Sequence, residues 1–466
     1  MTPESRIGPS LQKEPGLTLP DYHGGSLVNL MSSIATALGG SSPYPPLAAL
    51  PPEALAGARH LVLLVVDGLG LHYLAGRDGA LRRHLRGQLT SVFPSTTASA
   101  IPTFLTGLAP QQHGLTGWNM YFREIGAVVA PLPFRVRTGR HDLRDAGVSP
   151  ASLFGLTPLF DRLPLPCHVV SPQPIVHSDF NVALAGRAQR HGYGTLDELF
   201  ALVAGLTRSA APSYVYAYWP QLDSLAHEHG IHSEAVAAAF AALDAAFARL
   251  LDVAHDSVVI VTADHGFIDV DDTIDLDDHP ALRETLLLPL CGEPRAAYAY
   301  VRAGREAPFE DYVRGRLADR LQLFRSEDVL RQGWLGPGAA HPALRDRLGD
   351  FVLIPRGRAI LRDWLKGEER YTHVGVHGGL TAAEMTVPLV VAPLVILSES
   401  GQLAHARNSC RYRSRFRATG PARSSPPGGV SWSNASPVAS CRSTAQPSTP
   451  GRSSLPKPNW RASPSP

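Results

Sequence analysis

The chain has 466 residues, of which 44% are hydrophobic, enough for one large α/β domain with an insertion or for two to three average domains. Its net charge is +2, but ten basic and no acidic residues follow Ser400, so 33 basic and 41 acidic side chains remain before it. We therefore expect no nucleic-acid partner for the folded part. No apolar run reaches the roughly 18 residues that span a bilayer, and four scattered cysteines exclude a disulfide framework and a cysteine-based zinc site.

Residues 1–57 are interpreted as an N-terminal extension that contains one helix-like run, Ser26–Leu38. The polar beginning of this segment, dotted with Pro and Gly, lacks the basic-then-apolar pattern of a signal peptide. We therefore expect a cytoplasmic protein without a membrane partner.

From His60 onward, short apolar runs alternate with helical patterns. The first run, His60–Val66, ends in Asp67, and the clearest helical pattern covers Ser233–Ala254. Further apolar runs recur at residues 167–170, 214–219 and 257–262. Such short continuous runs suit strands that are buried on both faces. The alternation predicts an α/β three-layer sandwich, with a mainly parallel central sheet, helices on both faces and ligands at the carboxyl ends of the strands.

The rest of the chain is less regular. Residues 267–370 are interpreted as a smaller inserted cap, in which strands at 296–301 and 350–354 flank a helical piece near 309–323. The main domain spans residues 58–398 and returns to a buried strand at its end. After residue 400 the sequence holds 14 Ser and 10 Pro, too few apolar side chains to offset the entropy of ordering. Residues 399–466 are therefore predicted to be a disordered, basic tail rich in Ser, Pro and Arg.

Ionisable side chains follow two of the predicted strands. Asp67 directly follows the run 60–66, and Asp264 and His265 come shortly after the run 257–262. Adjacent residues of a strand point to opposite faces, so Asp264 and His265 can share an ion only where the chain turns, as Gly266 permits. An Asp-Gly turn after a strand is also commonplace in proteins without a metal, so Asp67 alone carries little weight.

Two more segments supply possible metal ligands. Asp223 and His227 are four residues apart, which places both on one helical face and within reach of one ion. His377 precedes two glycines, which allow a tight turn and a close backbone approach. Each feature has an ordinary structural explanation, but their joint occurrence matches the needs of a binuclear site.

A hydroxyl-rich stretch, Ser95-Thr96-Thr97, precedes a helix-capable run that ends at Thr106. A helix N-terminus offers unpaired amide donors and a favourable dipole to an anion. Ser and Thr also favour helix N-caps for their own sake, so position alone does not separate the two explanations.

Together these segments resemble the alkaline phosphatase superfamily, and within it the type I phosphodiesterase/nucleotide pyrophosphatase family. The resemblance covers about residues 58–396 and is carried by five motifs, in this order. They are VVDGLG, FPSTTASAIPTFLTGLAPQQHGLTGW, DSLAHEHG, TADHGF and HGGLTAAEMTVPLVV.

The resemblance implies a catalytic threonine nine residues before Thr106, which is Thr97, with Thr96 and Ser95 as nearby rivals. It also implies two divalent metal ions, of which zinc fits the nitrogen and carboxylate ligands and manganese or iron are alternatives. The family pattern assigns the ligands in two sets. One ion would be held by Asp67, Thr97, Asp264 and His265, and the other by Asp223, His227 and His377.

One position departs from the family pattern. Nucleotide pyrophosphatases commonly carry an Asn five residues after the His of a Pro-x-x-His-Gly segment, where it holds a phosphoryl oxygen. Counting from His113 gives Trp118, with Asn119 as its neighbour, so Asn119 is only a candidate for substrate binding.

The resemblance therefore predicts a metal-dependent hydrolase of phosphodiester or pyrophosphate bonds that acts on a small phosphate ester or nucleotide through a covalent phosphothreonine-type intermediate. A phosphomonoesterase, phosphonate hydrolase or phosphomutase of the same superfamily is the alternative within enzymes. A non-catalytic metal-binding relative is the alternative of another class. A sulfatase would need a Cys or Ser within a Cys/Ser-x-Pro-x-Arg motif, and a P-loop NTPase its Gly-x-x-x-x-Gly-Lys loop, and neither motif occurs here.

Overall fold

The structure of the chain is a computed structural model that describes residues 16–393, except 140, 255, 369 and 371. Its centre is a seven-stranded sheet in the order β2-β18-β9-β1-β8-β6-β7. Only β18 runs antiparallel to its neighbours, and the other pairings in this sheet are parallel. In that order the strands are Leu85–Thr90, Thr386–Pro393, Ser257–Thr262, His60–Val66, Ser213–Trp219, Cys167–Pro172 and Gln189–Tyr193. The mainly parallel central sheet predicted from the sequence is thus confirmed.

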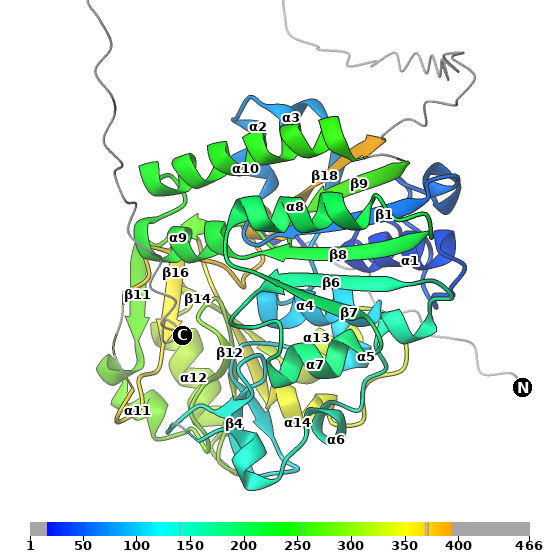
Figure 1. Cartoon of the computed structure of the whole chain (residues 1–466). Coiled ribbons are helices and arrows are strands. Elements are labelled where there is room, and N and C mark those ends of the chain that lie inside the picture. Colours follow the sequence, from blue (N-terminus) through cyan, green and yellow to red (C-terminus); the bar gives the residue numbers. More distant parts are fainter. Residues whose placement is uncertain (1–15, 140, 255, 369, 371, 394–466) are drawn as a thin grey trace, which may run out of the picture. The chain divides into compact units, whose positions relative to one another are not determined.

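Helices lie on both faces of this sheet (Figure 1). On one side run α8 (Leu196–Leu206) and α10 (Glu234–Val253), and on the other α1 (Leu27–Ala37) and α4 (Thr97–Thr106). The helix predicted at Ser233–Ala254 begins where Ser233 accepts a hydrogen bond from the Val236 amide as an N-cap. Shorter helices complete the layers: α2 (Leu71–Ala75), α3 (Ala80–Arg83), α5 (Pro110–His113), α6 (Pro150–Phe154), α7 (Asp179–Ala185), α9 (Gln221–His229) and α15 (Ala382–Met385).

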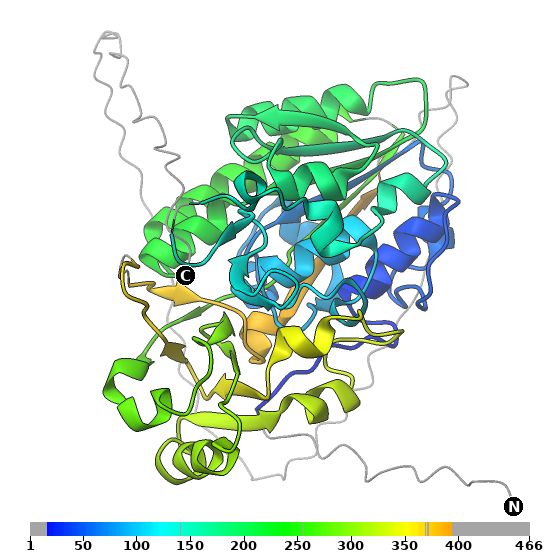
Figure 2. The same ribbon diagram turned by 90° about the horizontal axis from the view of Figure 1, so that it is seen from below.

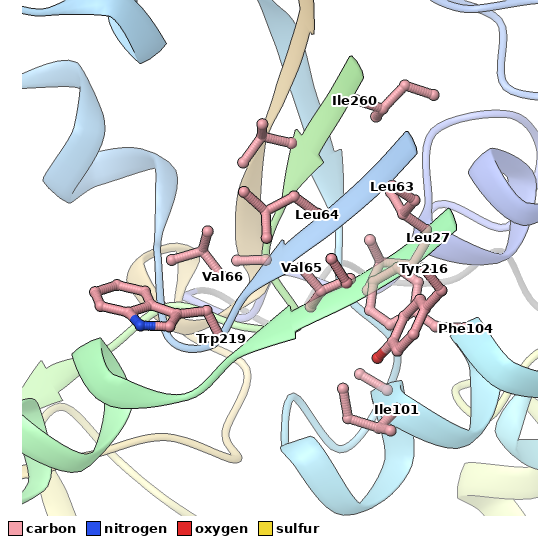
Figure 3. Packing of buried hydrophobic residues seen from close by; sticks show 14 of the residues in the cluster. Leu27, Leu63, Leu64, Val65, Val66, Ile101, Phe104, Tyr216, Trp219 and Ile260 are labelled. Atoms are coloured by element: carbon pink, nitrogen blue, oxygen red, sulfur yellow. The ribbon is translucent and has the colours of Figure 1, made fainter. Parts of the chain in front are cut away.

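Strand β1 is buried along its whole length because both of its faces are covered. Figure 3 shows Leu63 and Val65 on the side of Leu27 and Phe104, whereas Leu64 and Val66 lie on the other side. Every second side chain of a strand points to the same face, so a strand between two helical layers needs apolar side chains on both faces. This is the physical reason that the run His60–Val66 does not alternate with polar residues.

The region predicted as an inserted cap contains a second, antiparallel sheet in the order β12-β13-β15-β14 (Figure 2). Its strands are Cys291–Glu293, Ala296–Ala299, Phe351–Pro355 and Leu321–Arg325, and its helices α11 (Pro280–Arg283), α12 (Glu306–Arg316), α13 (Ser326–Arg331) and α14 (Leu344–Leu348). The helical piece predicted near 309–323 is wrong in its last part. The helix ends at Arg316, and residues 321–325 form strand β14 because they pair with β15.

Small pairings link the remaining segments. β10 (Ile268–Asp269) pairs with β17 (Gly375–Val376), β11 (Asp272–Asp275) pairs with β16 (Ala359–Arg362), and the third group is β3 (Met120–Phe122), β4 (Ala127–Ala130) and β5 (Arg135–Val136). Helix α1, from the segment expected to be an extension, contributes Leu27, Val28 and Met31 to the main core. Among the described residues, no helix has both the length and the apolar character that crossing a membrane requires. The predicted tail at 399–466 lies outside the described residues.

Candidate metal centre

The candidate centre forms at the carboxyl ends of three neighbouring strands of the main sheet. β1, β8 and β9 are parallel and adjacent, so their last residues lie at one edge. Asp67 directly follows β1, and Asp264 and His265 follow β9. Helix α9 begins two residues after β8 and carries Asp223 and His227. The fifth segment enters from β17, which His377 directly follows.

Asp67, Asp264 and His265 form the first half of the site. The Nε2 atom of His265 lies 3.3 Å from Asp67 Oδ1 and 3.4 Å from Asp264 Oδ2. All three residues are buried. The other oxygen of Asp264 accepts hydrogen bonds from the Gly68 and His265 amides at 3.1 and 3.0 Å. These bonds fix the carboxylate and leave Oδ2 directed at the imidazole.

Asp223, His227 and His377 form the second half. The Asp223 Oδ1 atom lies 3.4 Å from His227 Nε2 and 3.6 Å from His377 Nε2, and the two Nε2 atoms are 3.2 Å apart. Asp223 Oδ1 also lies 4.0 Å from His265 Nε2, so the two halves adjoin. The structure therefore brings all six predicted Asp and His residues into one compact cluster.

The three hydroxyls of the segment 95–97 face different partners. Ser95 Oγ donates to the Gly379 carbonyl oxygen at 2.7 Å, and Thr96 Oγ1 donates to Glu293 Oε1 at 2.7 Å. Thr97 Oγ1 lies 3.1 Å from His265 Nε2 and 3.5 Å from Asp67 Oδ2. Thr97 is the first residue of α4 and is partly exposed, whereas its two rivals are buried. Of the three, Thr97 is the one whose hydroxyl faces the carboxylate and imidazole cluster.

The tautomers of the histidines fit metal ligands. In each ring the Nδ1 atom faces a backbone carbonyl oxygen: Gly375 for His227, Gly266 for His265 and Ser95 for His377. A hydrogen bond donated by Nδ1 leaves the lone pair of Nε2 free for a cation. Two such lone pairs 3.2 Å apart repel each other unless a cation lies between them.

The carboxylates fit the same interpretation. Asp67 Oδ1, Asp223 Oδ1 and Asp264 Oδ2 are buried and have no hydrogen-bond donor among the described residues. Burial, with the charges of Asp264 and Asp223, raises the pKa of Asp67 well above its ordinary value. Burial and the neighbouring imidazoles lower the pKa of His377 well below its own. Buried carboxylates without a compensating charge are costly, and divalent cations would supply that charge.

Two glycines make this geometry possible. A Cβ atom on Gly266 would lie 2.0 Å from the carbonyl oxygen of Ala383, so only glycine allows β9 to turn where Asp264 and His265 converge. Gly378, beside His377, has φ +111°, and a Cβ there would lie 3.0 Å from that of Glu293.

Sequence reasoning missed several residues that support the centre. The Tyr218 hydroxyl, at the end of β8, donates to Asp67 Oδ2. Glu293 binds the hydroxyl segment through Thr96, and burial raises its pKa to about 7. Glu384 forms a fully buried ion pair with Arg295. A tyrosine near the end of β8 continues the alternating pattern of that strand, so the sequence gives only a weak signal that Tyr218 has a role at the centre. Nothing in the local sequence distinguishes Glu293 from the other carboxylates of the cap.

Asn119, the candidate for substrate binding, is buried in the loop before β3. Its backbone pairs with Gly292 of β12 through hydrogen bonds in both directions. The amide of its neighbour Trp118 donates to Glu293 Oε1 at 2.7 Å. The loop therefore meets the cap sheet at the sequence position where the family pattern has an Asn that holds a phosphoryl oxygen. The role of Asn119 in substrate binding stays a prediction.

Comparison with known proteins places this geometry in context. A model of the family described as type I phosphodiesterase / nucleotide pyrophosphatase matches residues 61–380, more than half of the chain. No curated protein sequence matches the chain.

Solved structures share the fold at low sequence identity. Murine ectonucleotide pyrophosphatase / phosphodiesterase 5 is 16% identical, with a TM-score of 0.54 over 71% of this chain and 87% of that one. An inactive variant of the same murine protein, in complex with AMP, is 17% identical, with a TM-score of 0.52 over the same shares. Phosphonoacetate hydrolase from Sinorhizobium meliloti 1021, in complex with phosphonoformate, is 20% identical, with a TM-score of 0.51 over 73% of this chain and 92% of that one. These likenesses confirm the predicted fold class.

Proposed function

The chain belongs to the type I phosphodiesterase/nucleotide pyrophosphatase family of the alkaline phosphatase superfamily, and we propose that it is a two-metal hydrolase of phosphodiester or pyrophosphate bonds. The observation that carries the proposal is the position of Thr97 Oγ1, 3.1 Å from His265 Nε2 and beside Asp67. A hydroxyl at a helix N-terminus, against unpaired carboxylate oxygens and free imidazole lone pairs, is what a metal-activated nucleophile requires.

Two divalent cations would be held by two sets of residues that share the edge of the sheet. Asp67, Asp264 and His265 would hold one cation with Thr97, and the remaining ligands, Asp223, His227 and His377, would hold the other. When bound, such cations favour the alkoxide of the threonine and offset the charge that develops on the phosphoryl oxygens. The nitrogen and carboxylate donor set suits zinc, with manganese or iron as alternatives.

In the proposed reaction Thr97 Oγ attacks phosphorus in line with the leaving oxygen. The new bond from Oγ to phosphorus forms as the bond to the leaving alcohol or phosphate breaks, and the leaving oxygen takes up a proton. Water then attacks the phosphothreonine, which returns the threonine hydroxyl and releases the second product. Because Thr97 is the first residue of α4, the amides at the N-terminus of this helix would be available to stabilise a phosphoryl oxygen.

Nucleotides are the first substrates to test, because a solved relative of this fold is described in complex with AMP. A phosphonate substrate is the second, because another is described as a phosphonoacetate hydrolase. A phosphomonoesterase or phosphomutase would differ from the proposed enzyme in the side chains of its substrate pocket, and these side chains are not among the proposed metal ligands.

Thr97→Ala tests the proposal. Removing the nucleophile should lower kcat for bis-p-nitrophenyl phosphate by about a thousandfold or more while zinc content and melting temperature stay near those of the wild type. Ser99→Ala is the matched control, because Ser99 also carries a hydroxyl in α4, but its buried Oγ has no hydrogen-bond partner among the described residues. Thr97→Ser should retain part of the activity. Full activity in Thr97→Ala would exclude this residue as the nucleophile.

A further inference from the structure

Glu293 is a buried carboxyl group that the cap sheet presents to the metal centre. It is the last residue of β12, and only 5% of it is exposed. Its Oε1 atom accepts two hydrogen bonds of 2.7 Å, from Thr96 Oγ1 and from the Trp118 amide. Thr96 is the N-cap of α4 and directly precedes Thr97. The carboxyl group therefore joins the cap to the segment that carries the proposed nucleophile.

A further contact places Glu293 beside the second set of proposed ligands. Its Cβ packs so closely on Gly378, beside His377, that a side chain on that glycine would meet it at 3.0 Å. The carboxyl group therefore lies beside residues that border both sets of proposed ligands, Thr96 and Gly378.

The charge balance of the proposed centre depends on its carboxylates. Two divalent cations would be balanced by three aspartates and Glu293, and a deprotonated Thr97 would leave one net negative charge before substrate binds. Divalent cations bound nearby would favour the ionised form of the Glu293 carboxyl group, against the effect of burial. A phosphomonoester dianion brings one more negative charge into this site than a phosphodiester monoanion.

We propose that Glu293 is a specificity-determining residue that favours phosphoryl groups carrying one negative charge over those carrying two. The inference rests on the proposed function, because it assumes that phosphorus binds beside Thr97. The carboxylate acts in two ways: its hydrogen bonds hold the segment 96–97, and its charge opposes dianions. The two effects can be separated, because Gln keeps the acceptor oxygen and removes the charge.

The test compares the wild type with Glu293→Gln, Glu293→Asp and a control, Glu198→Gln. Glu198 caps α8 through a capping box, and Gln serves at that position as well as Glu. The ratio of kcat/KM for p-nitrophenyl phosphate to that for bis-p-nitrophenyl phosphate is measured at alkaline pH with metal content determined for each variant. Calorimetry with methylphosphonate, a dianion, and dimethylphosphinate, a monoanion, gives a second readout that needs no turnover.

Glu293→Gln should shift both ratios toward the dianion by on the order of tenfold, the effect of one unit charge roughly 10 Å away at an effective dielectric constant near 20. Glu293→Asp and Glu198→Gln should keep the wild-type ratios. Unchanged ratios in Glu293→Gln, or the same shift in Glu293→Asp, would overturn the inference while leaving the proposed hydrolase intact. Full activity in Thr97→Ala would instead overturn the proposed function and, with it, this inference.

Discussion

The buried Arg295–Glu384 ion pair is predicted to hold the loops of the metal centre in place. Both side chains are 0% exposed, and the guanidinium meets the carboxylate in a bidentate arrangement, Nε to Oε1 at 3.0 Å and Nη2 to Oε2 at 2.9 Å. The Glu384 carboxylate also accepts from the Gly379 amide at 2.8 Å, and its backbone oxygen accepts from the Gly266 amide at 2.8 Å. One residue therefore ties together the turns after His265 and His377.

Glu384→Gln should lower the free energy of unfolding by about 3–5 kcal/mol, because it leaves a fully buried guanidinium opposite a neutral amide. Glu310→Gln is the control. Glu310 also pairs with an arginine, Arg325, but that side chain is 56% exposed, so its loss should cost about 0–1 kcal/mol. Urea unfolding of the metal-free proteins, with the shift in midpoint multiplied by the common slope, gives both values.

The stability that the Arg295–Glu384 ion pair contributes should decrease in acid. Burial alone would raise the pKa of Glu384, but the charge and hydrogen bonds of Arg295 and the bonds from Thr381 and Gly379 hold it below its ordinary value of 4.5. A depressed pKa in the folded state contributes stability that is complete above the ordinary value and is lost as the pH falls through the folded value. The difference between wild type and Glu384→Gln should therefore be constant near neutral pH and shrink below about pH 4.5. A difference in unfolding free energy between wild type and Glu384→Gln of less than about 1 kcal/mol at neutral pH, equal to that for Glu310→Gln, would refute the reasoning.

Two further predictions concern the metal ligands. Asp223→Asn should lower the zinc content measured by mass spectrometry from two ions per chain to about one, because Asp67, Asp264 and His265 remain to hold the other ion; retention of both ions would contradict the ligand assignment. Tyr218→Phe removes the hydroxyl that orients Asp67, and zinc titration should show an affinity about 10–100-fold weaker, whereas an unchanged affinity would deny the tyrosine a positioning role.

The fold followed from the sequence because its main signal is local. The runs His60–Val66 and Ser257–Thr262 coincide with β1 and β9 to the residue, since a strand covered on both faces is apolar at nearly every position. Residues 321–323, predicted as helix but found at the start of strand β14, show the limit. That segment is a strand because β15 lies beside it, and a distant partner leaves no trace in local periodicity.

The candidate ligands could be found for a related reason. Asp67 directly follows the strongly apolar strand β1, Asp264 follows β9 after one residue, and the spacing of Asp223 and His227 is that of a helix turn. Their assembly into one cluster required the family resemblance, because nothing in the sequence states that β1, β8 and β9 are neighbours. Their roles as ligands, and that of Thr97 as nucleophile, stay predictions.

The residues that sequence reasoning missed share one property: none is a proposed metal ligand, and each hydrogen-bonds to a residue of the centre or to the backbone around it. Tyr218 acts through Asp67, Glu293 through Thr96, and Glu384 through backbone amides. A metal ligand must be one of a few residue types, so its chemistry marks it in a sequence. A supporting residue needs only a polar atom at the right place, which many residue types supply. Two of these three residues involve the cap: Glu293 belongs to it, and Glu384 pairs with Arg295, which follows β12. The cap is therefore a structural part of the candidate centre and not only a cover over it.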